Sequence, residues 1–298
     1  MAGQRARFVA AIAAAAWLSG CALLSGKPVA EVPTEALSAS DAHMAKFGFR
    51  PLPDTRKPAQ AAAFDRIRRV YVKGSGPKVI LLHELPGLRD GDIEVGVALS
   101  NDFEVYMPLL FGAAGQEDTN LGIKQACNSR LFNCNDRNTR HSIVTDLLAM
   151  TNAVCGGECG VIGMCLTGTL PLSLMAAPGV VAMVMAQPTL PIVWHIWPFA
   201  GLDISAEDTA TAMAAATQRK ASIYLLRYRG DRISGRTAFN RLVKRIAPAK
   251  DQLSFFEVAE VAGHGHSTLV KDSKQPNVAG EQLQAVAKAL NARLRARR

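Results

Sequence analysis

The chain has 298 residues and a formal net charge of +9, with 49% hydrophobic and 20% charged residues. This balance supplies apolar side chains for a large buried core and excludes a chain that is disordered throughout. No basic surface rich in aromatic residues is apparent in the sequence, so we expect no nucleic-acid partner.

The N-terminus carries the pattern of a secretion signal. Arg5 and Arg7 precede an apolar run, residues 9–18, which is too short to cross a membrane as a helix. Residues 18–21, which end in Cys21, resemble a bacterial lipobox. The resemblance implies that Cys21 is diacylated and becomes the new N-terminus. An ordinary signal peptide with an incidental cysteine is the alternative.

This interpretation divides the chain into three segments. Residues 1–20 are the signal peptide, residues 21–60 are the lipidated cysteine and a tether punctuated by prolines, and residues 61–298 are the folded domain. Within the tether, residues 34–47 are compatible with a short helix. Ala22 rather than Asp follows the anchor, so we expect a lipid-anchored protein of the cell envelope, on the periplasmic face of the outer membrane.

From about residue 66, short apolar runs alternate with helical patterns, which predicts a mainly parallel sheet flanked by helices. The runs lack polar alternation, as expected for parallel strands buried on both faces. The predicted strands are Val70–Lys73, Val79–His83, Phe103–Pro108, Gly160–Met164, Val180–Gln187, Ile223–Tyr228 and Phe255–Val261. Helices are predicted over Asp92–Asn101, Arg140–Cys155 and Gly280–Arg298. A further helix is predicted to begin at Ser205, where Asp208 completes a capping-box variant.

Residues 160–168 have the pattern of a strand that turns into a helix at Cys165. In the nucleophile elbow of an α/β-hydrolase, the nucleophile sits on a tight, strained turn of this kind. The residue two positions earlier must be very small, because the two backbones nearly touch, and Gly163 meets that need. A helix N-terminus would favour the thiolate of Cys165. The alternative is a buried structural cysteine.

The chain order supplies partners for this nucleophile, because in this fold the acid and then the histidine follow it. Asp231 and His266 each come shortly after a predicted strand. His266 would accept the thiol proton and return it to the leaving group, and Asp231 would fix the imidazole tautomer and stabilise its cation. The alternatives are a turn role for Asp231 and His264 in place of His266. Structural roles are expected for His43, His83, His141 and His195.

Four motifs, in order, resemble the dienelactone hydrolase family. They are the strand and glutamate-containing turn at 79–87, the Pro-x-Leu-Phe-Gly turn at 107–112, the cysteine elbow at 163–168 and the Gly-His-Ser ending at 265–267. The resemblance covers roughly residues 60–290. It implies an α/β-hydrolase fold and hydrolysis of a small ester or lactone through a thioester on Cys165, with no cofactor and no metal.

The same resemblance implies further site residues. Glu84 matches the glutamate that engages the resting cysteine, where its negative charge would disfavour the thiolate until substrate displaces it. The backbone N–H groups of Leu85 and Leu166 would form the oxyanion hole. Thr167 departs from the family, because glycine is usual there. The substrate-binding arginines stay open among Arg130, Arg229, Arg232 and Arg236.

Four other cysteines would meet an oxidising compartment after export. They allow three pairings, of which the simplest joins Cys127 to Cys134 and Cys155 to Cys159. Zinc binding is the rival interpretation, but the spacings fit a zinc ribbon poorly.

The predicted protein is therefore a monomeric, lipid-anchored ester or lactone hydrolase with a Cys-His-Asp triad. The alternative is a hydrolase scaffold that has lost catalysis and binds a small ligand or a partner. Thiol–disulfide exchange is weaker, because no Cys-x-x-Cys motif is present.

Overall fold

The computed structural model describes residues 34–53, 67, 69–118, 122, 142–189, 204–271 and 276–295. These residues form an eight-stranded sheet with the order β1-β2-β4-β3-β5-β6-β7-β8. The strands are β1 (Arg50–Pro51), β2 (Arg69–Lys73), β3 (Lys78–Leu82), β4 (Glu104–Leu109), β5 (Cys159–Met164), β6 (Val180–Ala186), β7 (Ser222–Tyr228) and β8 (Phe255–Val261). The strands from β4 to β8 in this order pair in parallel, whereas β2 is antiparallel to both β1 and β4.

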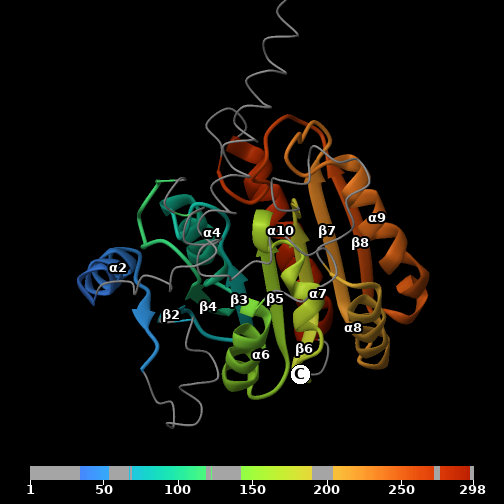
Figure 1. The fold of residues 1–298 in the computed structure, drawn as a ribbon, viewed down its shortest axis with the longest axis horizontal. Helices are drawn as coiled ribbons and strands as arrows, with labels where there is room; N and C mark the ends of the chain where they lie inside the picture. The colour runs from blue at the N-terminus through green and yellow to red at the C-terminus, as the bar shows by residue number, and fades with distance from the viewer. Residues whose placement is uncertain are drawn as a thin grey trace, which may run out of the picture.

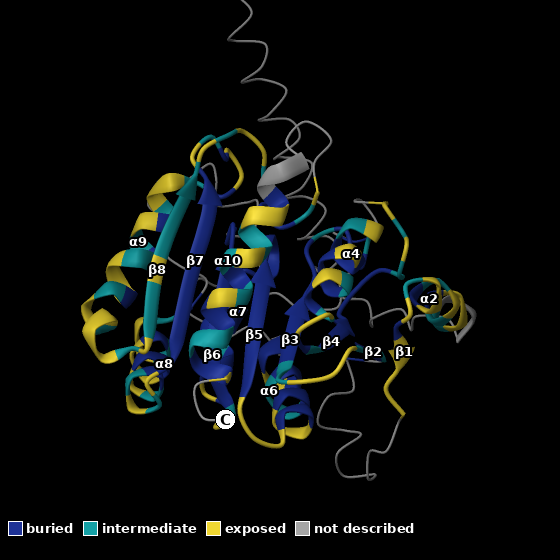
Figure 2. Ribbon diagram, turned by 180° about the vertical axis from the view of Figure 1, so that it is seen from behind, coloured by how far each residue is buried: buried dark blue, intermediate teal, exposed yellow. Residues whose placement is uncertain are grey.

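Helices cover both faces of the sheet (Figures 1 and 2). One face carries α6 (Ser142–Cys155), α7 (Leu170–Leu174), α8 (Ala206–Gln218) and α9 (Arg236–Ile246), and α9 is followed by a 3-10 turn, η4 (Ala247–Gln252). The other face carries α4 (Asp90–Leu99) and α10 (Pro276–Leu294). Alternate residues of a strand enter different cores: Ile80 packs under the first group of helices and Leu81 under the second. Burial on both faces explains why the strands are apolar throughout.

The predicted mainly parallel sheet flanked by helices is confirmed. Each of the seven predicted strands forms, with ends within one residue of the prediction. The predicted cap at Ser205 also forms, because its hydroxyl oxygen accepts from the Asp208 N–H at 2.9 Å. The two-residue strand β1 and helix α9 were not predicted. Helix α10 begins four residues earlier than predicted, and its last residue is Leu294.

Residues 34–53, which fall within the predicted tether, pack on the sheet. Helix α2 (Thr34–Lys46) buries Met44 completely, and Asp41 accepts hydrogen bonds from Arg69 and from the Tyr71 hydroxyl. Strand β1 then pairs with β2. The helix expected over 34–47 is therefore present, but as part of the folded body. The predicted signal peptide and Cys21 lie outside the described residues.

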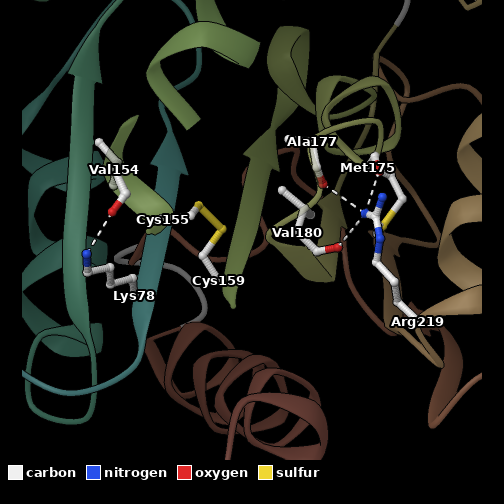
Figure 3. Close-up of a disulfide and its surroundings, with 8 residues drawn as sticks. All are labelled: Lys78, Val154, Cys155, Cys159, Met175, Ala177, Val180 and Arg219. Carbon is white, nitrogen blue, oxygen red and sulfur yellow. Dashed lines mark hydrogen bonds between the residues drawn. A yellow bond between two sulfur atoms is a disulfide. The ribbon is translucent and has the colours of Figure 1, made fainter. Parts of the chain in front are cut away.

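A disulfide joins Cys155, the last residue of α6, to Cys159, the first residue of β5 (Figure 3). This is one of the two local pairs favoured by the spacing, whereas Cys127 and Cys134 lie outside the described residues. Basic side chains bind backbone carbonyls nearby: Lys78 donates to the Val154 carbonyl near the end of α6, and Arg219 donates to the Met175, Ala177 and Val180 carbonyls at 2.8–3.0 Å. The disulfide ties the start of β5 to the end of α6, and Cys165 directly follows the other end of β5.

None of the helices in the described ranges has the length and apolar character needed to cross a membrane.

Candidate active site

Cys165 lies at the carboxyl end of β5, on a strained turn. Its φ is 53°, in the left-handed region that few non-glycine residues adopt, and it begins the 3-10 turn η2 (Cys165–Thr167) that leads into α7. A Cβ atom at Gly163 would lie 2.2 Å from the Thr167 carbonyl oxygen, so only glycine fits there. The backbone contact expected of a nucleophile elbow is therefore present, and Cys165 is a free cysteine.

Thr167, the residue that departs from the family, fits the elbow through its hydroxyl group. The side chain is completely buried, and its oxygen accepts from the Met164 N–H at 3.0 Å. The same hydroxyl lies 2.9 Å from the Met164 carbonyl and 3.2 Å from the Leu82 carbonyl of β3. The Thr167 hydroxyl thus makes hydrogen bonds both within the turn and to the neighbouring strand β3.

His266 and Asp231 come together beside this turn. His266 Nδ1 lies 2.8 Å from Asp231 Oδ2, and the other Asp231 oxygen accepts from the backbone N–H groups of Ile233 and Ser234 at 2.7 and 2.9 Å. Asp231 therefore serves as a turn residue and as the partner of the histidine. The structure brings His266 rather than the exposed His264 to this carboxylate.

The electrostatics favour a charged His266. Burial of the ring opposes protonation, but the hydrogen bond to Asp231 and the nearness of Cys165 outweigh burial and raise the pKa of His266 to about 10. Among the described residues, no group meets the buried His266 Nε2 atom with good hydrogen-bond geometry. Ligand atoms of Glu84, Cys165 and His266 all lie within 4.8 Å of one another. The sulfur and the imidazole ring are therefore close enough to interact directly.

Glu84 is 1% exposed and is held by residues that the sequence analysis did not single out. Its Oε1 atom accepts from Arg89 Nη2 at 2.6 Å and from the Ser267 hydroxyl at 2.5 Å. Asp92 accepts from Arg89 Nε and from the Glu84 N–H, both at 3.2 Å. Burial first, and the negative charge of Glu84 second, raise the pKa of Asp92 to about 8. In the sequence, only the position of these residues near the carboxyl end of a strand could have indicated them, because ligand sites in such sheets form there.

Loop residues after β6 complete the surroundings of the sulfur. The Thr189 hydroxyl lies 3.4 Å from Cys165 Sγ, and the Thr189 N–H donates to the Cys165 carbonyl at 3.0 Å. Gln187, with φ of 36°, accepts through Oε1 from both the N–H and the hydroxyl of Thr268, two residues after His266. Only their position after a buried strand could have indicated Gln187 and Thr189.

His83 has the structural role expected of it. Its Nε2 accepts from the Leu110 N–H at 3.1 Å, and Nδ1 lies 3.0 Å from the Glu84 carbonyl. Complete burial lowers the pKa of His83 to about 4, so the ring is neutral and joins the ends of β3 and β4.

The remaining predicted positions divide into two groups. Leu166 directly follows the nucleophile candidate in the elbow, and Leu85 directly follows Glu84, so both lie at the carboxyl edge of the sheet. Among the four candidate arginines, Arg229 and Arg236 contact Glu260 of β8, Arg232 is exposed, and Arg130 lies outside the described residues. The arginine that contacts Glu84 and Asp92 is Arg89 instead.

Solved structures resemble this chain in fold. A candidate hydrolase from Bacillus subtilis aligns with a TM-score of 0.51 and 12% identity, over 86% of this chain and 99% of that protein. A candidate dienelactone hydrolase from Klebsiella pneumoniae aligns with a TM-score of 0.51 and 15% identity, over 76% of this chain and 92% of that protein. No protein-family model and no curated protein sequence matches the chain. The sheet, its topology and these likenesses show that the chain has the α/β-hydrolase fold.

Proposed function

We propose that this protein hydrolyses an ester or a lactone through a thioester on Cys165. The observation that carries the proposal is the arrangement of Cys165, His266 and Asp231: a buried cysteine on a strained elbow, beside a histidine that is bonded to a carboxylate. In this arrangement the sulfur can act as nucleophile, the imidazole as acid and base, and the carboxylate as orienting group.

The proposed reaction has two steps. The Cys165 thiolate attacks the substrate carbonyl carbon, the bond to the alkoxy oxygen breaks, and the leaving alkoxide takes the proton from His266. Neutral His266 then removes a proton from water, which attacks the thioester carbonyl and releases the acid and the thiolate. The N–H groups of Leu85 and Leu166 are the proposed donors to the tetrahedral oxyanion.

The role proposed for Glu84 changes in view of its contacts. An isolated carboxylate beside the sulfur would oppose a thiolate, but Arg89 lies against Glu84 at 2.6 Å and offsets its charge. Glu84 is therefore proposed as the group that positions Arg89 and Ser267 around the sulfur.

Turnover of small activated esters tests the proposal. We expect the chain from residue 22 onward to hydrolyse such esters and Cys165→Ala to lose at least about a thousandfold in kcat/KM, as expected when a nucleophile is removed. His264→Ala serves as the matched control, because His264 is an exposed histidine two residues from His266. A Cys165→Ala variant as active as the parent would refute the assignment, and a parent without turnover whose Cys165 is inert to iodoacetamide would favour a binding protein.

The choice of a small ester or lactone rests on the motifs shared with dienelactone hydrolases and on the fold shared with a candidate member from Klebsiella pneumoniae. A panel of lactones and short-chain esters would identify the preferred class. Equal, slow hydrolysis of every compound would argue against a lactone as the substrate.

The lipid anchor and the envelope location are also proposals. Their support is the lipobox resemblance at residues 18–21. Mass spectrometry of the protein from a bacterial host should find a diacylated N-terminal peptide that begins at Cys21 and disappears in Cys21→Ala. An unmodified peptide that begins elsewhere would contradict the proposal.

A further inference from the structure

The side chains around the sulfur form a second kind of site. Glu84, Cys165 and His266 come from three different strand ends, and one ligand atom of each lies within 4.8 Å of the other two. Thiolate, imidazole and carboxylate are the three ligand types that zinc takes in proteins, and a three-residue site leaves its fourth position to water.

We propose that Glu84, Cys165 and His266 bind a zinc ion, and that zinc binding reversibly blocks the nucleophile. Tetrahedral zinc with bonds of about 2.0–2.3 Å places its ligand atoms roughly 3.5 Å apart. The observed separations, all at or below 4.8 Å, require only small movements of side chains. This inference goes beyond the proposed hydrolysis, because the site exists whether or not an ester is turned over.

The contacts of His266 prepare it as a ligand. Its Nδ1 is engaged with Asp231 Oδ2 at 2.8 Å, which leaves Nε2 to face the other two residues. Nε2 is buried, and no group among the described residues meets it with good hydrogen-bond geometry, so this nitrogen is available to a metal ion. A carboxylate behind a zinc-bound histidine fixes the ring and raises its basicity.

The side chains around the site are mostly acidic. Glu84 and Asp231 lie within it, and Arg89 pairs with both Glu84 and Asp92 beside it. A bound zinc ion would accept the sulfur lone pair that would otherwise attack the substrate. The metal-loaded protein would therefore be inactive until a chelator removes the ion.

Direct metal binding tests the proposal without reference to catalysis. The full chain with Cys21→Ser, Cys127→Ser and Cys134→Ser keeps Cys165 as its free thiol beside the Cys155–Cys159 disulfide. Cobalt(II) should bind one per chain and give a thiolate charge-transfer band in the near ultraviolet, and Zn²⁺ should remove that band. Zinc affinity is then measured by competition with a chromogenic chelator.

Substitutions assign the ligands. Cys165→Ala should abolish the charge-transfer band, and Glu84→Gln, which keeps an acceptor for Arg89 and Ser267, should weaken zinc binding at least tenfold with the band retained. Asp231→Asn should weaken binding by about 10–100-fold, the usual effect of removing such an outer carboxylate. His264→Ala should bind as the parent does. Circular dichroism melts establish that each variant is folded.

The proposal is overturned if the parent shows no charge-transfer band, or if Cys165→Ala binds zinc as the parent does. Unchanged affinity in Glu84→Gln also overturns it, because the metal would then be a simple thiol adduct. Zinc binding together with a fully active Cys165→Ala enzyme would refute the proposed hydrolysis alone, and the two proposals are thus separable.

Discussion

Thr167 offers the sharpest test of how the elbow is held together. In Thr167→Val the side chain keeps its shape but loses the hydroxyl, so the Met164 N–H loses an acceptor 3.0 Å away in a completely buried position. A buried donor without a partner costs about 1–3 kcal/mol, and the carbonyl that received the hydroxyl proton also loses its partner. We expect the free energy of unfolding to fall by about 2–3 kcal/mol.

The assay is thermal unfolding followed by circular dichroism. At roughly 2–4 °C per kcal/mol for a domain of this size, Thr167→Val should melt about 4–12 °C below the parent. Thr167→Ser keeps the hydroxyl and should be more stable than the valine variant. Thr217→Val is the matched control: its hydroxyl donates to the Ala214 carbonyl at 3.0 Å on α8, and its loss should change stability by less than about 0.5 kcal/mol.

Two results would refute this reasoning. If Thr167→Val melts within a degree of the parent, the hydroxyl does not stabilise the turn. If Thr167→Ser is the less stable of the two variants, the methyl group matters more than the hydrogen bonds. A confirmed loss in Thr167→Val should also change the rate at which iodoacetamide labels Cys165, because the turn that presents the sulfur would then be relaxed.

Other expectations follow from the charges and the disulfide. The pKa of His266 is raised to about 10. The stabilisation that comes from pairing His266 with Asp231 is therefore complete below about pH 6.5 and is lost as the pH rises through 10. Asp231→Asn should lower the melting temperature more at pH 6 than at pH 10.5. Asp92 has a pKa raised from 3.8 to about 8, so the folded protein holds a proton that the unfolded chain releases, and stability should fall as pH rises from about 4 to 8. A melting series over that range should show a flatter decline in Asp92→Asn, and equal slopes would contradict the assignment. Replacing Cys155 and Cys159 by serine should lower the free energy of unfolding by about 2 kcal/mol, because the unfolded chain is no longer cross-linked. Urea denaturation measures this loss, and an unchanged midpoint would contradict the prediction.

The sheet was predictable because its signal is local. Strands such as β5 and β6 are buried on both faces, so each is a continuous apolar run that stands out in the sequence. Strand β1 has two residues, both exposed, and therefore leaves no apolar pattern. Helix α2 was detected as a possible helix, but the sequence did not reveal that Asp41 anchors it to β2.

The candidate site was predictable only where the order of residues along the chain indicates their roles. The glycine before Cys165 and the residues after β7 and β8 follow from the rules of the fold. Arg89, Ser267 and Thr189 were not predicted, because their contacts form only on folding. Ser267 and Glu84, for example, are 183 residues apart in the chain. Nothing in the sequence alone ranks Arg89 above the other arginines.

The contacts of Glu84 change the role that this residue is expected to have beside Cys165. The sequence suggested a single opposing carboxylate, with activation depending on its displacement. The structure instead surrounds the sulfur with two opposite-charge pairs, Glu84 with Arg89 and Asp231 with His266. Glu84 and His266 each have a ligand atom within 4.8 Å of the sulfur, and Arg89 and Asp231 hold these two side chains through direct ion pairs. In the proposed mechanism, selectivity would then arise from how a substrate carbonyl reaches the sulfur, and the proposed zinc ion would compete with the substrate for the same position.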